Sequence, residues 1–400
     1  MKQKRYLQKA LFGFFVLLLF GVLSFCAFGA SSAAKVSLSL NNVTESSAVL
    51  NWKSEGKADG YLIYRYDYAA KSFDRVAVTS KTTFTFKKLQ GGESYCFGVR
   101  AYLENGKTLE KGKLAKVKCY TPLSAVTVIK QTQTTATSHK LQWKAVSGAD
   151  TYQIYYFMDS TKSFSLLGTT EHPYCTVKKL KPASVSQYKV RPVSLCANGK
   201  TVKAKTSEIF YAYTNPGDIE RFTAEDVTST GYRLVWDAVP DADGYRIFRY
   251  NAKQGKYKRL TEVQTTSCTV ENLAPCSTEF YKICAYKELL GKVRYGARTA
   301  ALSLTTKPET VTPVLLARPA ANGVIKVGWN KGVCDGYLVF GAEREEGPYQ
   351  LLEQVDSPDT LSCAIRSPFD SEILYVRVKT YVTVDGNAIL SPYSDAILID

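Results

Sequence analysis

The sequence predicts an all-β protein made of four tandem β-sandwiches behind an N-terminal export segment. The chain of 400 residues contains 27 tyrosines and 18 phenylalanines but only 2 methionines, a composition that favours strands over helices. Its four tryptophans recur at spacings of 91, 93 and 93 residues. Each interval holds short alternating apolar runs with turn residues about every 8–12 positions, as in a β-sandwich, and no long stretch with helical periodicity.

The first part of the chain has the pattern of an export signal. Residues 1–9 carry four basic and no acidic residues, and residues 10–30 carry no charge. This pattern predicts a secretory signal sequence that is cleaved near Gly29 or Ala33. The alternative is an uncleaved signal anchor, because the 21 uncharged residues are just long enough to span a bilayer. In both cases the rest of the chain is expected outside the cytoplasm, secreted or at the cell surface.

Each repeat is marked by aromatic residues at nearly fixed distances from its tryptophan. The residue two positions before each tryptophan is apolar, so both are expected to face the core between two sheets. One tyrosine follows after 8 or 9 residues and another after 43–46 residues. In chain order the markers are Trp52, Tyr61 and Tyr95; Trp143, Tyr152 and Tyr188; Trp236, Tyr245 and Tyr281; Trp329, Tyr337 and Tyr375.

Prolines just after the last strand of a repeat indicate the domain boundaries. These prolines are Pro122, Pro216 and Pro308, and short linkers rich in proline are typical of boundaries between domains. The expected parts are the export segment 1–34 and four sandwiches at residues 35–122, 123–215, 216–308 and 309–400.

Two short motifs recur around these markers. Asp-Gly-Tyr opens the third strand of repeats 1, 3 and 4, and Leu-x-Pro precedes the second tyrosine in repeats 2 and 3, from Leu180 and Leu273. With the tryptophan of the second strand and a tyrosine corner, these motifs resemble the fibronectin type III family over about residues 35–400, repeat 4 being the most divergent. The resemblance implies immunoglobulin-like sandwiches with adhesion, spacing or protein-interaction roles. The integrin-binding Arg-Gly-Asp of that family is absent.

The net charge of +16 is unevenly distributed. Residues 35–122 carry a net +7 and residues 123–214 a net +8, whereas residues 215–308 carry +3 and residues 309–400 carry −6. Nucleic acid is a poor partner for an exported chain. An anionic membrane or an anionic wall polymer suits the basic repeats 1 and 2 better. The alternative is that this charge only keeps the surface soluble.

The cysteines predict core thiols more than a disulfide framework. Cys175, Cys268 and Cys363 occupy one repeat position, where repeat 1 has Phe84. A position that accepts phenylalanine or cysteine is expected to face the core, so these three are predicted to be buried and unbridged. Cys96 and Cys119, in the last two strands of repeat 1, are the best candidates for a bridge.

No catalytic, nucleotide-binding or metal-binding signature is present, and the chain has only two histidines. We therefore expect no enzyme activity, no cofactor and no metal site. Strand alternation predicts one binding face on repeat 1, where Tyr64, Tyr66, Arg100 and Tyr102 point outward. Such a face can stack on sugar rings or dock a partner sheet; the alternative is that its aromatics only stabilise cross-strand pairs. Repeat 3 has a similar outward set in its own strands: Phe248, Tyr250 and Tyr286.

These observations predict a non-catalytic array held at or near the surface of a bacterial cell, where it mediates adhesion or spacing. Its partner would be a protein or a cell-surface polymer that the sequence does not identify. The alternative is a carbohydrate-binding accessory protein of a polysaccharide-degrading system, with a glycan as the partner. Fold alone does not choose between them.

Overall fold

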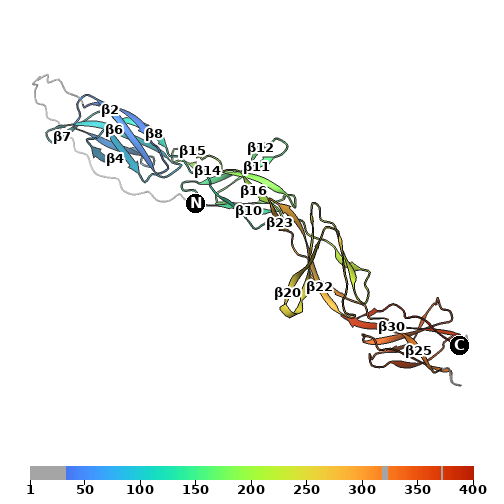
Figure 1. Ribbon diagram of the computed structural model, residues 1–400. Helices are drawn as coiled ribbons and strands as arrows, with labels where there is room; N and C mark the ends of the chain where they lie inside the picture. The colour runs from blue at the N-terminus through green and yellow to red at the C-terminus, as the bar shows by residue number, and fades with distance from the viewer. Residues whose placement is uncertain (1–32, 318–322, 371–372) are drawn as a thin grey trace, which may run out of the picture. The chain divides into compact units, whose positions relative to one another are not determined.

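The computed structural model describes residues 33–317, 323–370 and 373–400 (Figure 1). The export signal expected in residues 1–34 lies outside the described residues except for Ala33 and Ala34. Ala34 is buried, and its amide donates to the Lys57 carbonyl at 3.0 Å. Within the described ranges, no helix is both long enough and apolar enough to cross a membrane.

The described chain forms four β-sandwiches, each with a three-stranded and a five-stranded sheet. In the first, the sheets have the orders β1-β2-β5 and β4-β3-β6-β7, and β8 also pairs with β6. All pairs are antiparallel. Its strands are β1 Lys35–Asn41, β2 Ser47–Glu55, β3 Gly60–Asp67, β4 Ser72–Thr79, β5 Thr83–Lys87, β6 Ser94–Asn105, β7 Thr108–Lys111 and β8 Ala115–Tyr120.

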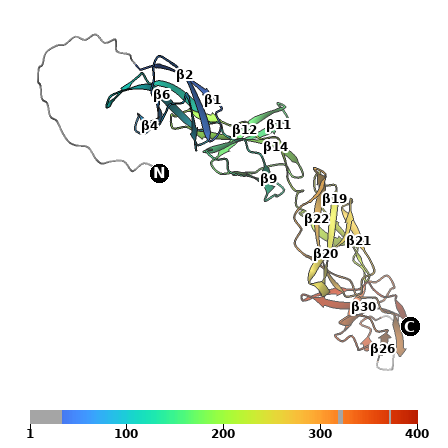
Figure 2. The same cartoon turned by 60° about the vertical axis from the view of Figure 1, so that its left-hand side comes forward.

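The other three sandwiches repeat this strand order, each within itself. Figure 2 shows β19, β20 and β22 of the third sandwich. The second comprises β9 Ile129–Thr132, β10 His139–Trp143, β11 Thr151–Met158, β12 Ser163–Thr170, β13 Tyr174–Val177, β14 Val185–Leu195, β15 Thr201–Lys203 and β16 Phe210–Tyr213. The third comprises β17 Phe222–Glu225, β18 Tyr232–Trp236, β19 Gly244–Asn251, the short 3₁₀ helix η1 Ala252–Gln254, β20 Lys256–Val263, β21 Ser267–Val270, β22 Thr278–Leu289, β23 Lys292–Tyr295 and β24 Leu302–Thr305. The fourth comprises β25 Pro313–Ala317, β26 Val324–Trp329, β27 Gly336–Ala342, β28 Gln350–Val355, β29 Ser362–Arg366, β30 Leu374–Val384, β31 Asn387–Leu390 and β32 Ile397–Ile399.

The four tryptophans lie in the cores, as the sequence predicts. Trp236 is only 5% exposed, and its ring meets that of Tyr245 edge-on with 5.4 Å between centroids. The Tyr245 hydroxyl accepts a hydrogen bond from the Val239 amide at 2.8 Å, which ties the loop between the second and third strands to the core. The same buried tryptophan–tyrosine pair recurs in the other repeats.

The second tyrosines do not occupy equivalent positions in the four sandwiches. Tyr188 and Tyr281 take the position of Phe97 in repeat 1 and are fully buried. Tyr95 lies two residues earlier, and its hydroxyl accepts from the Gln90 amide at 2.8 Å, as a tyrosine corner requires. In repeat 4 this inward position is held by Val376. Tyr375 is the residue before it and is only half-buried. In repeats 1–3 this inward position lies 45 residues after the tryptophan, so Tyr95, at 43 residues, falls two residues before it.

None of the nine cysteines in the described part of the chain forms a disulfide bond. Cys175, Cys268 and Cys363 pack against the cores of their own sandwiches, which confirms their inward direction, although they are half-buried and not fully buried. The bridge considered for Cys96 and Cys119 is not formed. Cys119 is buried opposite Tyr95, whereas Cys96 lies opposite Lys118 on the other face of the same sheet.

Candidate functional site: the outer face of repeat 1 and a hollow in repeat 3

Strand register brings the four candidate residues of repeat 1 onto one face. In the pairing of β3 with β6, Leu62 lies opposite Arg100 and Gly60 opposite Tyr102. Because side chains alternate along a strand, Tyr64 and Tyr66 share the face of Leu62. All four candidates are half-buried on the outer surface of the five-stranded sheet.

The tyrosine rings of this face are already in contact with neighbours in the same sandwich. The Arg100 guanidinium lies 5.0 Å from the centre of the Tyr64 ring, within cation–π range. The Tyr66 ring meets Tyr68 and Phe73 at centroid distances of 5.1 and 5.0 Å. The rings therefore stabilise the sheet and do not form a free flat platform.

Tyr102 has a structural role that explains the Asp-Gly-Tyr motif. A Cβ atom on Gly60 would lie 2.6 Å from the Tyr102 hydroxyl, so the tyrosine can lie across this position only if it is glycine. Repeats 3 and 4 contain the same glycine–tyrosine pair. Repeat 2 instead pairs Thr151 with Val193, so a smaller residue replaces the tyrosine where the glycine is lost.

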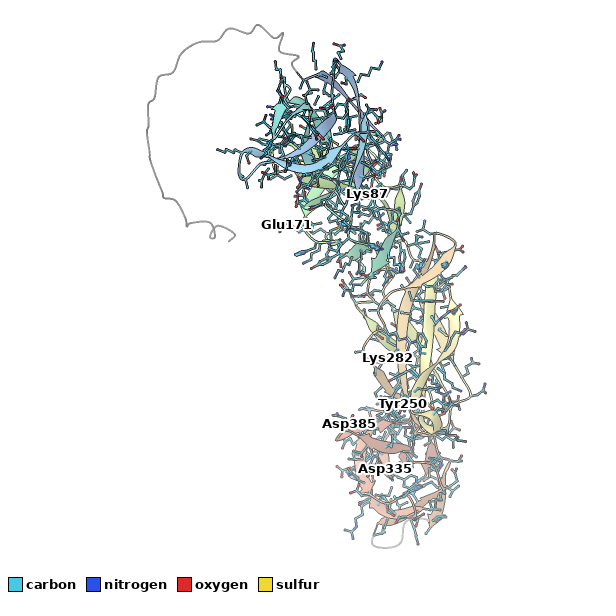
Figure 3. All side chains as sticks on the ribbon, turned by 90° about the vertical axis from the view of Figure 1, so that its left-hand side faces the viewer. Lys87, Glu171, Tyr250, Lys282, Asp335 and Asp385 are labelled. Carbon is cyan, nitrogen blue, oxygen red and sulfur yellow. The ribbon has the colours of Figure 1, made fainter. Side chains whose placement is uncertain are left out.

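A basic side chain lies over an aromatic ring of the adjoining hairpin in every repeat. In repeat 3, Lys282 lies 5.0 Å from the centre of the Tyr257 ring, which in turn contacts Tyr250 at 5.2 Å; Tyr250 and Lys282 are labelled in Figure 3. Repeat 1 has glycine at the position of Lys282, and Lys116 of the neighbouring strand takes its place over Phe73. The corresponding contacts in repeats 2 and 4 are Lys189 over Phe164 and Arg377 over Tyr349.

The outer face of repeat 1 also gathers cations without carboxylate partners. Arg75 lies opposite Tyr64, and Lys116 and Lys118 lie opposite Gly98 and Cys96, so all three share the face of Arg100. None of these four cations has a carboxylate oxygen within 4.0 Å among the described residues. We call Arg75, Arg100, Lys116 and Lys118 the basic face of repeat 1.

Neither metal binding nor thiol chemistry is favoured on this face. Across the described ranges, no three histidine, cysteine, aspartate or glutamate side chains come together as metal ligands. Burial raises the pKa of the Cys96 thiol, although Lys116 and Lys118 oppose that rise. The thiolate, which is the nucleophile and the metal ligand, is therefore scarce at neutral pH.

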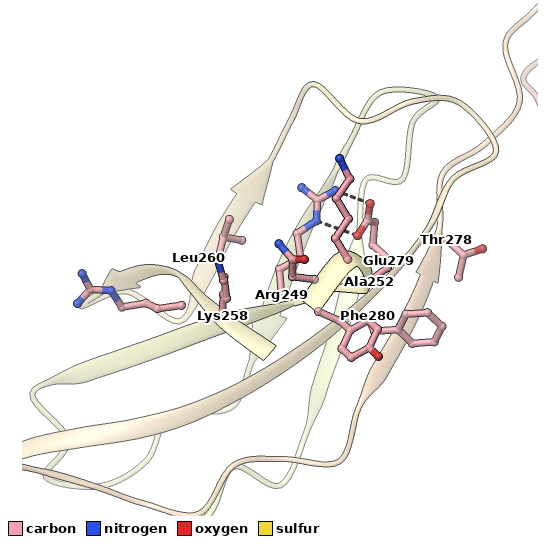
Figure 4. A pocket seen from close by; sticks show the side chains of 11 residues that line it. Arg249, Ala252, Lys258, Leu260, Thr278, Glu279 and Phe280 are labelled. Atoms are coloured by element: carbon pink, nitrogen blue, oxygen red, sulfur yellow. Dashed lines mark hydrogen bonds and ion pairs between the residues drawn. The ribbon is translucent and has the colours of Figure 1, made fainter. Parts of the chain in front are cut away.

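Repeat 3 contains an open hollow that the sequence analysis did not find. It has a volume of about 540 Å³ and lies between the hairpin of β19 and β20 and the start of β22 (Figure 4). At its centre Arg249 donates from Nε to Glu279 at 2.8 Å, and a second contact joins the same two side chains. The remaining lining residues are Tyr250, Asn251, Ala252, Lys253, Lys258, Arg259, Leu260, Thr278 and Phe280.

The Arg249–Glu279 pair distinguishes this hollow from the same place in the other repeats. Glu279 takes the position of Tyr95, whose ring stacks on Phe97 in repeat 1 with 5.8 Å between centroids. In repeat 4 the position of Arg249 is Gly341, and a Cβ there would lie 2.6 Å from the Leu352 side chain. A comparison of strand registers shows that repeat 1 also has an arginine at the position of Arg249, Arg65, but Tyr95 where repeat 3 has Glu279, so the charged pair is absent there.

Comparisons with known proteins agree with this architecture. Residues 32–117 match the model of the fibronectin type III domain family. Receptor-type tyrosine-protein phosphatase F of Bos taurus is 24% identical over 74% of this chain, and receptor-type tyrosine-protein phosphatase eta of Mus musculus is 24% identical over 85%. The chain spans only 16% and 26% of the lengths of these two proteins.

Two solved structures are also similar. A two-domain fibronectin type III segment of chicken tenascin is 20% identical, with a TM-score of 0.38, and covers 46% of this chain and all of its own. The central fibronectin-III array of RIM-binding protein is 14% identical, with a TM-score of 0.20, and covers 68% of this chain and 96% of its own. Fibronectin type III domains are typical of extracellular regions, and receptor proteins carry such arrays. With one matched domain and the same strand order in all four sandwiches, the chain is a tandem fibronectin type III domain protein.

Proposed function

We propose that this protein is a non-catalytic array that works outside the cytoplasm, where it spaces or attaches surfaces, and that the basic face of repeat 1 contacts an anionic surface. The observation that supports this proposal is the set of four cations on one sheet face that have no carboxylate partner among the residues that the structure describes. Cations that are not neutralised within the protein contribute to its long-range field and attract polyanions.

In repeat 3, by contrast, several arginines are neutralised by ion pairs within the same sandwich. Its Arg233, Arg246 and Arg249 each form an ion pair with a glutamate of the same sandwich. Repeat 3 carries a net +3 and repeat 1 a net +7. We infer that the first repeat, more than the third, supplies the electrostatic attraction to an extended anionic surface.

Binding of the full chain to an anionic surface tests this function. One arm uses vesicles with and without phosphatidylglycerol, and the other uses a soluble anionic wall polymer. Replacing Arg75, Lys116 and Lys118 with alanine should weaken binding by about 1 kcal/mol per residue. The matched control removes three exposed lysines of repeat 1 outside the face, Lys53, Lys81 and Lys87, and should weaken binding less.

Salt provides the second readout. Binding should fall steeply with ionic strength, because exposed charges are screened beyond about 8 Å at physiological salt. Binding that ignores salt, equal losses in both triple variants, or no binding in either arm would count against the proposal. Binding to only one of the two probes identifies the lipid or the polymer as the source of the anionic groups.

The alternative is a carbohydrate-binding accessory protein that uses Tyr64 and Tyr66. The contacts of these rings with Arg100, Tyr68 and Phe73 argue against it, because a sugar would have to displace them. A glycan array with the full chain decides the matter. Repeatable sugar binding that is lost in Tyr64→Ala or Tyr66→Ala would favour this alternative over the anionic-surface function.

A further inference from the structure

We propose that the hollow in repeat 3 is a binding site for an acidic saccharide, a sugar chain of about two residues that bears carboxylates. The proposal goes beyond the function proposed above, because it concerns different residues in a different sandwich. It rests on the charges that remain free in the hollow, on its apolar walls and on the strand irregularity beside it.

The charges that line the hollow leave two lysines free. Arg249 is paired with Glu279, and Arg259 lies 3.6 Å from the Glu262 carboxylate. Lys253 and Lys258 are exposed, and neither has a carboxylate within 4.0 Å in the described ranges. The lining has four cations, Arg249, Lys253, Lys258 and Arg259, and one carboxylate, Glu279. The Glu262 carboxylate near Arg259 is shared with Arg246, so an excess of positive charge remains that a ligand with carboxylates can neutralise.

The apolar walls suit a sugar ring. Phe280 is 39% exposed and Leu260 is 40% exposed, and both line the hollow. The Phe280 ring is held edge-on to Tyr250 with 6.3 Å between centroids, which fixes its orientation. Exposed aromatic faces stack on the C–H faces of sugars, and a volume of about 540 Å³ lies in the usual range of small-ligand sites, about 300–1,000 Å³.

The geometry of the edge strand disfavours an extended peptide as the ligand. β20 forms the edge of its sheet, and an added peptide strand would need its regular row of backbone groups. The register of β20 against β19 shifts between Ile247 and Phe248, so that Leu260 is left as a bulged residue beside the hollow. A bulge interrupts the ladder that a peptide would extend, so a compact ligand fits the hollow better.

Titration calorimetry and saturation-transfer NMR on the full chain test this inference. The probe is digalacturonic acid, with two carboxylates, and its neutral counterpart is the corresponding galactose disaccharide. Digalacturonic acid should bind and the neutral sugar should bind at least tenfold more weakly. The double variant Lys253→Glu/Lys258→Glu should lose at least tenfold in affinity. The matched control Lys292→Glu, on an exposed residue of β23, should keep the wild-type affinity.

Each other outcome overturns the proposal. Equal binding of the acidic and neutral sugars would show that the lysines do not recognise carboxylates, and equal losses in the control would show a nonspecific charge effect. No binding of digalacturonic acid, or binding of an acidic peptide instead, would exclude an acidic-saccharide site. The alanine variants of the basic face of repeat 1 should not change this affinity, which separates the test from that of the anionic-surface function.

Discussion

The cores of repeats 1 and 3 fill the same space from different strands. In repeat 1, Ala48 of β2 lies opposite Phe86 of β5, and Phe86 stacks on Phe97 with 3.9 Å between centroids. In repeat 3 the larger residue of the pair lies on the other strand: Tyr232 of β18 is opposite Val270 of β21. Because protein interiors are close-packed, a larger side chain on one strand of this pair is accommodated by a smaller one on its partner. The larger member of the pair therefore lies on β5 in repeat 1 and on β18 in repeat 3.

This exchange also changes the chemistry of the core. The Tyr232 hydroxyl donates to the Tyr281 hydroxyl at 3.0 Å, and both side chains are buried. Repeat 1 has no counterpart to this bond, because Ala48 and Phe97 occupy those two positions. Repeat 3 thus depends on a polar pair where repeat 1 depends on stacked rings. Burying such groups is unfavourable unless each is hydrogen-bonded.

The largest expected effect tests what the two cores share. Trp236→Ala and Trp52→Ala should each destabilise their own sandwich by about 3–5 kcal/mol, because both remove a large buried ring. Hydrogen exchange of the full chain, read by mass spectrometry for each repeat, measures both losses. If the two losses differ by more than about 1 kcal/mol, the tryptophan environments are not equivalent and the common scaffold is less uniform than the packing indicates.

Replacing the glycine at the start of the third strand should destabilise repeats 1 and 3 to different extents. The three atoms nearest to a Cβ on Gly60 all belong to the Tyr102 side chain, whereas those nearest to a Cβ on Gly244 include the Val263 carbonyl oxygen at 2.6 Å. Gly60→Ala should cost about 1–3 kcal/mol and Gly244→Ala more, since a backbone atom cannot move aside as a side chain does.

A second substitution sharpens that difference. Tyr102→Val should restore most of the stability lost in Gly60→Ala, because repeat 2 has valine opposite a larger residue at this place. Tyr286→Val should not restore Gly244→Ala, since the Val263 carbonyl remains. Thermal unfolding of the single and double variants measures both. Equal rescue in the two repeats would show that the tyrosine alone sets the requirement for glycine.

Sequence reasoning predicts the scaffold well because the scaffold depends on spacing. Trp236 and Tyr245 must alternate with outward residues to reach the core, and that alternation is visible in the chain. The sizes of Tyr232 and Val270 become meaningful only once the two strands are paired. Tyr95 faces the core as the alternation predicts, and its two-residue offset from Tyr188 and Tyr281 is visible in its shorter distance from the tryptophan.

The candidate site is harder to predict for a related reason. Alternation places Tyr64 and Tyr102 on the outer face, and the register agrees. The contacts of Tyr64 with Arg100 and of Tyr102 with Gly60 are made across strands, so the sequence alone does not reveal them. That this face binds a partner stays a prediction. The hollow in repeat 3 depends on Glu279 standing where repeat 1 has a tyrosine, which becomes apparent only when the two registers are compared.

The buried tyrosine pair provides a third prediction, of about 1–3 kcal/mol. Tyr281→Phe removes the acceptor of the Tyr232 hydroxyl and leaves a buried donor without a partner, which costs that much in most proteins. The double variant Tyr232→Phe/Tyr281→Phe should lie within about 1 kcal/mol of the wild type, since it removes both polar groups. A double-mutant cycle by hydrogen exchange measures the coupling. Additive losses would mean that the hydroxyl bond contributes nothing specific to repeat 3.

Repeat 2 provides the smallest expected effect. It has a histidine, His139, where repeats 1 and 3 have Ala48 and Tyr232. His139 is fully buried; its Nε2 lies 3.1 Å from the Tyr188 hydroxyl and its Nδ1 lies 3.1 Å from the Tyr213 carbonyl. Burial lowers the pKa of His139 below its ordinary value, against the opposing effect of the carbonyl. The unfolded chain therefore binds a proton at a higher pH than the folded one does.

The sign of the pH dependence follows from this difference. Stability from the neutral His139 is present above the unfolded pKa, near 6.5, and is lost as the pH falls below that value toward the lowered folded pKa. The slope should reach at most about 1.4 kcal/mol per pH unit, the value for one proton. Hydrogen exchange of repeat 2 between pH 7.5 and 5 measures it, with His139→Tyr, which copies Tyr232, as the control. If the slope of repeat 2 persists in His139→Tyr, another group causes it, and the polar pair of repeat 2 is no more sensitive to acid than that of repeat 3.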